Sequence, residues 1–314
     1  MKKNLYSVPE NKKIRVIIDT DAFAEADDQF AIIHALLTPK FDVVGIIATH
    51  FGKDDSMINS YHEINRILEL TQMSDKVKVF KGSTCALEDE FTPQCSEGSQ
   101  FIINEAMRDS EQPLFVLNIG AITNLASAYL ANHSIKDRLL AVWIGGGKYP
   151  VGHIDFNLAN DIHAANAVFS SDIELWQIPI NAYTQMEVSF HELYYRIYQC
   201  GDVGKYLFTN LMRVNEHECS LEFDDLPFFK NSSKAAKTMI IRSGEGWSLG
   251  DNPAIGVLIT PQMNGIEERQ AQRINPDGTY GDYIATHRRI RVYNSIDSRV
   301  ILEDFFSKLN YHFG

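Results

Sequence analysis

Five acidic side chains lie within ten residues between Asp19 and Asp28, directly after an apolar run at residues 14–18. The run reads as a buried strand, and the spaced apolar residues that follow predict a helix over residues 29–37. Carboxylates this close repel one another by roughly several kcal/mol for a partly desolvated pair, so a cation is needed to hold them together. Because the ligands are hard oxygens, a divalent ion such as calcium or magnesium is favoured.

The acids fall into two pairs with different positions. Asp19 and Asp21 leave the strand, where alternate residues share a face, and Asp27 and Asp28 begin the helix. Helix capping explains one or two acids at a helix N-terminus, but it does not explain Asp19 and Asp21. Open α/β sheets bind ligands beyond the carboxyl ends of their strands, so we expect both pairs to face one crevice.

The segment resembles the N-terminal signature of the inosine–uridine nucleoside hydrolase family, Asp-x-Asp-Pro-Gly-x-Asp-Asp after a strand. This chain keeps both acidic pairs, but residues 22–26 make the middle two residues longer and lack the Pro-Gly turn. The resemblance implies Ca2+ as the cofactor, with Asp21 and Asp28 as ligands. It also implies Asp21 as the general base that accepts a proton from water, Asp27 as a substrate contact, and Asp19 as a residue that orients its neighbours.

A second motif follows a strand predicted at residues 114–117. Gly120 permits a tight turn, and Thr123 and Asn124 can cap a helix that begins near Leu125. The segment is similar to the family's Gly-x-Leu-Thr-Asn-x-Ala element. That similarity implies that the backbone carbonyl of Thr123 is a further calcium ligand.

A third motif contains Asp155 and Asn157 on either side of Phe156, after the triple glycine at residues 145–147. On an extended segment both side chains face one way, and a carboxylate with an amide suits adjacent sugar hydroxyls. Two polar residues on a solvated loop are the simpler alternative. The family has Glu-Phe-Asn-x-x-x-Asp here, which implies ribose binding by Asp155 and Asn157, while Asp161 is expected to cap a helix.

Two further positions complete the predicted site and show departures from the family pattern. Asp251 resembles the late His-Asp-Pro element, which implies a fourth metal ligand, although Asn252 is inserted before the proline and Gly250 replaces a histidine. A plain helix cap is the alternative for Asp251. Lys53 stands where the family usually has a sugar-binding Asn, so it is predicted to bind substrate, with a solvated loop lysine as the alternative. The acid that protonates the leaving base is open among His50, His153, His163 and Glu245.

Length and charge limit the classes of function. The 314 residues carry a formal charge of −12, which argues against nucleic acid or an anionic membrane as a partner. The N-terminus lacks the apolar stretch of a signal peptide and no apolar run approaches 18 residues, so we expect a cytoplasmic protein. The four cysteines show no CxxC spacing and predict neither a zinc site nor a disulfide framework.

Strands and helices alternate from residue 14 to about residue 180, which predicts an α/β fold with a mostly parallel central sheet flanked by helices. The predicted strands are 14–18, 43–48, 77–80, 114–117, 140–144 and 173–178; the predicted helices are 29–37, 58–70, 102–108, 125–132 and 163–169. The later part predicts helices at 191–198, 206–216, 251–259 and 297–309, an irregular acidic piece at 222–227, and a strand at 289–293 beside 265–273. We interpret residues 1–314 as a single nucleoside hydrolase-like domain with a helical and β-hairpin elaboration in its C-terminal half.

The four motifs occur in the family's order and together predict calcium-dependent hydrolysis of the N-glycosidic bond of a nucleoside or related ribosyl compound. The resemblance also implies a homo-oligomer, a dimer or a tetramer. Two alternatives stay open: a metal-dependent phosphohydrolase, for which Lys53 or Lys148 would bind phosphate, and a ribose- or nucleoside-binding protein of the same fold without turnover.

Overall fold

The computed structural model describes residues 2–220, 244–260, 265–285 and 288–314, and side-chain positions are not described for 218–220. The predicted irregular acidic piece at 222–227 lies outside these ranges.

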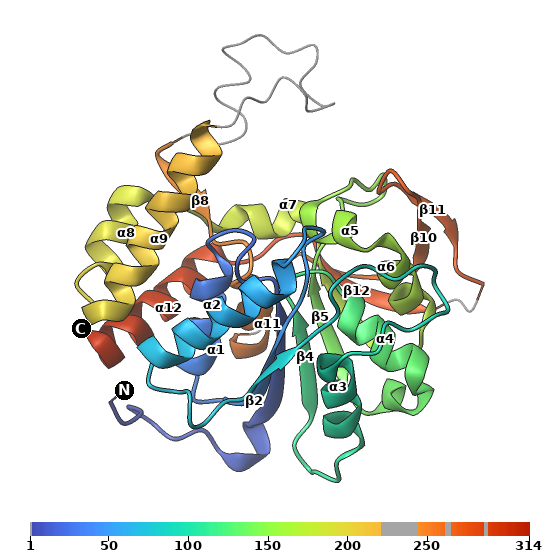
Figure 1. Ribbon diagram of the computed structural model, residues 1–314, viewed down its shortest axis with the longest axis horizontal. Coiled ribbons are helices and arrows are strands. Elements are labelled where there is room, and N and C mark those ends of the chain that lie inside the picture. The colour runs from blue at the N-terminus through green and yellow to red at the C-terminus, as the bar shows by residue number, and fades with distance from the viewer. Residues whose placement is uncertain (1, 221–243, 261–264, 286–287) are drawn as a thin grey trace.

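An eight-stranded sheet forms the centre of the molecule (Figure 1). Seven strands run parallel, and β9 alone pairs antiparallel, with β12. The mostly parallel sheet predicted from the sequence is therefore confirmed, as is the pairing of 289–293 with the segment near 265–273. In spatial order the strands are β3 (Val79–Lys81), β2 (Phe41–Ala48), β1 (Ile14–Thr20), β4 (Leu114–Asn118), β5 (Leu140–Ile144), β6 (Glu174–Ile178), β12 (Arg289–Tyr293) and β9 (Ile266–Gln270).

Helices cover both faces of the sheet, which explains why its central strands β1, β4 and β5 are mostly apolar and buried. Alternate residues of β1 serve the two faces: Val16 and Ile18 belong to one hydrophobic core, and Ile17 belongs to the other. The first core packs against α1 (Asp28–Leu36), α2 (Ser56–Leu70), α11 (Pro253–Ile259) and α12 (Ser298–Phe313). The second packs against α3 (Glu97–Met107), α4 (Thr123–Ala131) and α6 (Ile162–Ser170).

Further helices and a hairpin lie at opposite ends of the molecule (Figure 1). Helices α8 (Phe190–Ile197) and α9 (Gly201–Ser220) pack beside α12, and the hairpin of β10 (Gln272–Ile274) and β11 (Tyr280–Tyr283) lies at the opposite end (Figure 1). The helical and β-hairpin elaboration expected in the C-terminal half is thus present. The remaining elements are α5 (Phe156–Asn160), α7 (Ile180–Tyr183), the pair β7 (Glu187–Ser189) and β8 (Gly246–Ser248), and the 3-10 turns Glu10–Lys12, His133–Asp137 and Thr184–Met186.

The strand order reverses at β1, which pairs with β2 on one side and β4 on the other. The loops after β1 and β4 therefore diverge and leave a crevice at the carboxyl ends of these strands, the usual ligand position in an open α/β sheet. Within the described ranges, none of the helices has both the length and the apolar character needed to cross a membrane. Cys85, Cys95 and Cys200 are free thiols.

Candidate active site

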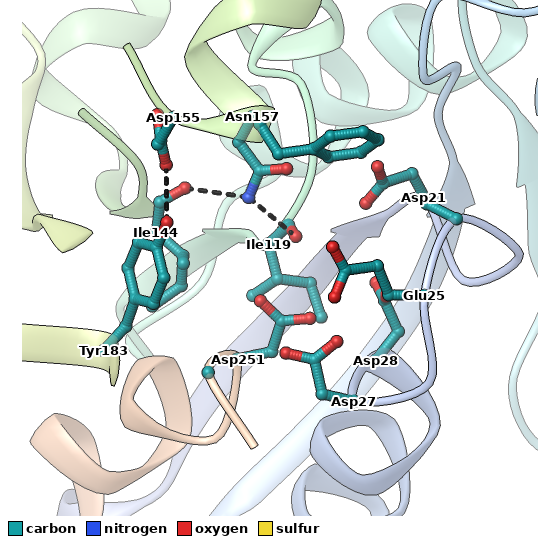
Figure 2. A pocket seen from close by; sticks show the side chains of 13 residues that line it. Asp21, Glu25, Asp27, Asp28, Ile119, Ile144, Asp155, Asn157, Tyr183 and Asp251 are labelled. Atoms are coloured by element: carbon teal, nitrogen blue, oxygen red, sulfur yellow. Dashed lines mark hydrogen bonds between the residues drawn. The ribbon is translucent and has the colours of Figure 1, made fainter. Parts of the chain in front are cut away.

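A cavity of about 70 Å3 opens at the predicted crevice, between the loops that follow β1, β4 and β5. At about 30 Å3 per water molecule it holds an ion with a water or two, so a larger ligand must extend through its open side. Figure 2 shows acids from the β1–α1 loop and Asp251 gathered together, with Asp155 and Asn157 across from them. The lining residues are Asp21, Ala24, Glu25, Asp27, Asp28, Ile119, Ile144, Asp155, Phe156, Asn157, Tyr183, Gly250 and Asp251.

Three carboxylates form a group with the spacing of metal ligands. One oxygen each from Asp27, Asp28 and Asp251 lies within 4.8 Å of the other two. Asp27 is the residue before α1 and Asp28 is its first residue, whereas Asp251 comes from the turn before α11, more than 200 residues later. The fold thus brings together the two predicted ligands Asp28 and Asp251, and it adds Asp27, which the sequence assigned to substrate.

Asp21 lines the same cavity, although it is not one of the three grouped carboxylates. Its side chain is 2% exposed, and Oδ2 has no hydrogen-bond partner within the described part of the chain. Gly120 makes room for it, because a Cβ at that position would lie 2.5 Å from Asp21 Oδ1. A buried carboxylate oxygen without a donor needs a cation or a water, so the all-oxygen set fits a hard divalent ion.

The pKa values of the carboxyl groups in the cavity also favour a bound cation. Burial raises the pKa of Asp21, Asp28 and Asp251 well above the ordinary aspartate value, and repulsion from neighbouring acids raises each further. Burial also raises the pKa of Asp155. Because ionised carboxylates are disfavoured here without a counter-charge, a bound cation would stabilise them in the charged form that a metal ligand and a general base both require.

Behind the cavity, Asp19 is held by a side chain from the β4–α4 segment. Asn124 Nδ2 donates to Asp19 Oδ1 at 3.0 Å, and Asn124 Oδ1 accepts from the backbone N–H of Ser83 at 2.8 Å. Burial raises the pKa of Asp19 to about 8. The predicted capping by Thr123 and Asn124 is wrong, because α4 begins at Thr123 itself and Asn124 is used for this tertiary contact.

Thr123 is buried but does not line the cavity. Its hydroxyl donates to Asp161 Oδ2 at 2.7 Å and lies 2.9 Å from Nε2 of His50. Asp161 also caps α6, as expected, by accepting from the N–H of Ala164. These contacts fix the start of α4, and the carbonyl of Thr123 as a metal ligand stays a prediction. Burial lowers the pKa of His50 to about 4, so the ring is neutral near pH 7.

Asp155 and Asn157 meet at the cavity, but not through an extended segment as the sequence suggested. Asp155 is the N-cap of the short helix α5 and Asn157 lies within it, so the helical turn brings them together. Asn157 Nδ2 donates to the carbonyls of Ile119 and Ile144 at 3.2 and 3.0 Å. Asp155 Oδ1 accepts from the N–H of Gly146 at 2.8 Å, and its Oδ2 accepts from the hydroxyl of Tyr183 at 3.1 Å.

The inserted Asn252 anchors the turn that carries Asp251. Its Nδ2 lies 3.0 Å from Nδ1 of His34, and Nε2 of His34 lies 2.8 Å from Asp304 Oδ2 on α12. A neutral ring that accepts at Nδ1 and donates from Nε2 satisfies both contacts, and burial lowers the pKa of His34 to about 4. The chain of contacts ties the turn to α1 and α12.

Some lining residues were not assigned a role from the sequence. Glu25 belongs to the lengthened loop and was counted only among the five clustered acids. Phe156 matches the Phe of the family's Glu-Phe-Asn element but was given no role, and Tyr183 carried no motif signal. Lys53 is exposed, with Nζ 5.9 Å from the ring centroid of Phe51, and it does not line the cavity. Its contact with substrate stays a prediction.

Known protein families, curated relatives and solved structures resemble most of this chain. The family described as inosine-uridine preferring nucleoside hydrolase matches residues 16–303. Uridine nucleosidase 1 of Arabidopsis thaliana is 25% identical over 209 residues, 58% of this chain and 61% of that protein. The pyrimidine-specific ribonucleoside hydrolase RihB of Escherichia coli (strain SE11) is 24% identical over 64% of this chain and 70% of its own length. The purine-preferring ribonucleoside hydrolase structure from Gardnerella vaginalis, 20% identical, superposes with a TM-score of 0.74 over 95% of this chain and 98% of that chain.

Proposed function

Because this chain belongs to the inosine-uridine preferring nucleoside hydrolase family, we propose that it hydrolyses the N-glycosidic bond of ribonucleosides or a related ribosyl compound, releasing base and ribose. One observation carries the proposal most directly. Asp21, whose buried Oδ2 finds no hydrogen-bond partner among the described residues, lines the same small cavity as the grouped carboxylates of Asp27, Asp28 and Asp251. A water molecule activated there would be next to its general base.

We propose Ca2+ as the ion, held by Asp21, Asp28 and Asp251 with the carbonyl of Thr123. The closeness of Asp28 to Asp251 and the all-oxygen donor set support this choice, since calcium accepts six to eight oxygen ligands in flexible geometry. When bound, the ion supplies positive charge that makes a water molecule more acidic and attracts sugar hydroxyls.

The protein's own residues then have separate tasks. Asp21 accepts the proton of the attacking water as general base. Asp155 and Asn157, oriented by Gly146, Tyr183 and two backbone carbonyls, hold the ribose hydroxyls on the opposite side of the cavity. Asp27 and Asp155 stabilise the positive charge that develops on the ribosyl ring in an oxocarbenium-like transition state.

The phosphohydrolase alternative has less support. Among the described residues, those that line the cavity include no lysine, arginine or histidine to attract a phosphate, and Lys148 lines a different cavity. An anionic ester would meet six carboxylates, which repel it in the absence of several metal ions.

The test measures release of reducing sugar from 4-nitrophenyl β-D-ribofuranoside and from a panel of nucleosides, with Ca2+ and after chelation. We expect hydrolysis that depends on Ca2+. Asp21→Asn should lower kcat at least about a hundredfold, the usual scale for a general base. Tight binding of ribosides with no release of sugar would instead identify a binding protein, and turnover of phosphate esters alone would identify a phosphohydrolase.

Two other expectations from the sequence stay predictions. One is the cytoplasmic location. The other is assembly into a dimer or tetramer, and sedimentation velocity of the purified protein would measure that oligomeric state.

A further inference from the structure

The β1–α1 loop carries the proposed general base at one end and two of the grouped carboxylates at the other. Asp21 begins the loop, Asp27 and Asp28 end it, and Figure 2 shows all three carboxylates around the cavity. The separation between the two ends therefore sets how the base lies relative to the metal ligands. This loop is two residues longer than the family signature and lacks its proline, which would have restricted the backbone. Its conformation must be fixed by other contacts.

The side chain of Gln29 joins the two ends of the loop. Its Nε2 donates to the backbone carbonyl of Ala22 at 2.7 Å. Ala22 directly follows Asp21, and Gln29 directly follows Asp28. A carbonyl oxygen only accepts, so this contact also fixes which end of the amide faces the loop. Gln29 and Ala22 are 2% and 0% exposed, so solvent does not compete for the bond. A second hydrogen bond joins the same two segments, from the hydroxyl of Thr20 to Asp28 Oδ1.

A buried carboxylate on the next helix directs the Gln29 amide. Nε2 also donates to Glu63 Oε1 of α2 at 3.3 Å, and Glu63 is 4% exposed. The hydroxyl of Tyr206 on α9 donates to the same oxygen, and Arg66 Nη1 lies 3.6 Å from the other oxygen. Burial and the adjacent Glu63 raise the pKa of Tyr206, so its hydroxyl keeps the proton that it donates. Side chains from α1, α2 and α9 thus form one network that ends on the backbone of the β1–α1 loop.

Resting on the proposed riboside hydrolysis and its Ca2+ site, we propose that Gln29 is a positioning residue for the reaction. Its hydrogen bond to the loop, directed by Glu63, fixes the general base relative to the metal ligands. Gln29 does not line the cavity and contacts neither substrate nor ion. Its effect is carried by the backbone, and α2 and α9 take part in the site through it although they contribute no residue to the cavity.

The variant Gln29→Met tests the hydrogen bond at nearly constant side-chain length. Isothermal titration with CaCl2 alone should show a Kd for Ca2+ raised about tenfold, and kcat for 4-nitrophenyl β-D-ribofuranoside at saturating Ca2+ should fall about tenfold, as when a residue that orients metal ligands is lost. KM should change less, because Asp155 and Asn157 come from a different segment. Gln100→Met, the same substitution at an exposed position of α3, is the matched control and should change none of these values.

Two variants of Glu63 separate its role as an acceptor from its packing. Glu63→Met removes the acceptor and should raise the Kd for Ca2+ and lower kcat in the same direction as Gln29→Met. Glu63→Gln keeps an acceptor oxygen and should recover most of that loss. The double variant Gln29→Met, Glu63→Met should be no worse than the stronger single variant, because both changes remove one shared hydrogen bond.

Urea titration of each variant distinguishes positioning from a purely structural role. A lower urea midpoint with an unchanged Kd for Ca2+ and an unchanged kcat in the folded protein would overturn the positioning role, as would additive effects in the double variant. If the wild type binds Ca2+ but hydrolyses no riboside, the hydrolase proposal fails and the Kd values still decide the role of Gln29. If the wild type binds no Ca2+, the metal site and the positioning role fail together.

Discussion

Calcium should stabilise this protein, and it should do so more at alkaline pH than at acidic pH. The reason is the group of buried carboxylates, whose pKa values burial raises above their ordinary value of 3.8. A carboxyl whose pKa is raised by folding contributes stability below pH 3.8, and this contribution is lost as the pH rises through the folded-state pKa. For Asp19 that window runs from 3.8 to about 8. The metal-free protein therefore becomes less stable toward pH 8, where the ion competes with fewer protons.

The size of the stabilisation follows from the linkage between Ca2+ binding and folding. Free Ca2+ at 100 times its dissociation constant adds about 2.7 kcal/mol to the free energy of unfolding. With an unfolding entropy of about 2.1 cal/mol/K per residue, 314 residues give about 0.7 kcal/mol/K. The expected rise in Tm is therefore about 4 °C at pH 8, and it should be clearly smaller at pH 5.

Differential scanning calorimetry with Ca2+ and with a chelator, at both pH values, measures this difference. Asp251→Asn should remove most of the shift, because it removes one member of the carboxylate group. Asp202→Asn, at an exposed position on α9, is the control and should keep it. An equal shift at pH 5 and pH 8, or a full shift in Asp251→Asn, would contradict the reasoning.

Two further predictions concern contacts around the cavity. Tyr183→Phe removes the donor to Asp155 Oδ2, so we expect KM for a riboside to rise severalfold with a smaller change in kcat, measured by steady-state kinetics; a loss confined to kcat would argue against sugar positioning. His34→Leu leaves Asn252 and Asp304 without their shared partner, which should lower the free energy of unfolding by about 1–3 kcal/mol in a urea titration. An unchanged urea midpoint would show that this network does not hold the turn before α11.

The strand-and-helix pattern could be predicted because each buried strand is a short apolar run bounded by polar residues. Residues 140–144 match β5 at both ends, and the α12 prediction located its N-cap at Asp297. The site was predicted from motifs at strand ends, since a parallel sheet necessarily gathers those ends on one edge. Asp28 and Asp251 meet there although more than 200 residues separate them.

The parts that could not be predicted depend on tertiary contacts. Asn124 reads as a capping residue in sequence, but the nearby buried Asp19 binds its amide instead. Asp155 and Asn157 share a face through a helical turn, and a three-residue stretch does not distinguish that from a strand. Tyr183 reaches the cavity because α7 follows β6 at the same sheet edge, and no local pattern signals this.

The position of β12 has a consequence for how the chain is made. This strand pairs with β6 on one side and β9 on the other, so the sheet lacks its last two strands until the final tenth of the chain has been synthesised. A nascent chain that ends before Arg289 exposes the backbone groups of β6 as an unpaired edge, which is the kind of surface that joins chains into aggregates. Truncation near the C-terminus should therefore reduce the yield of folded protein even though it removes no residue of the cavity.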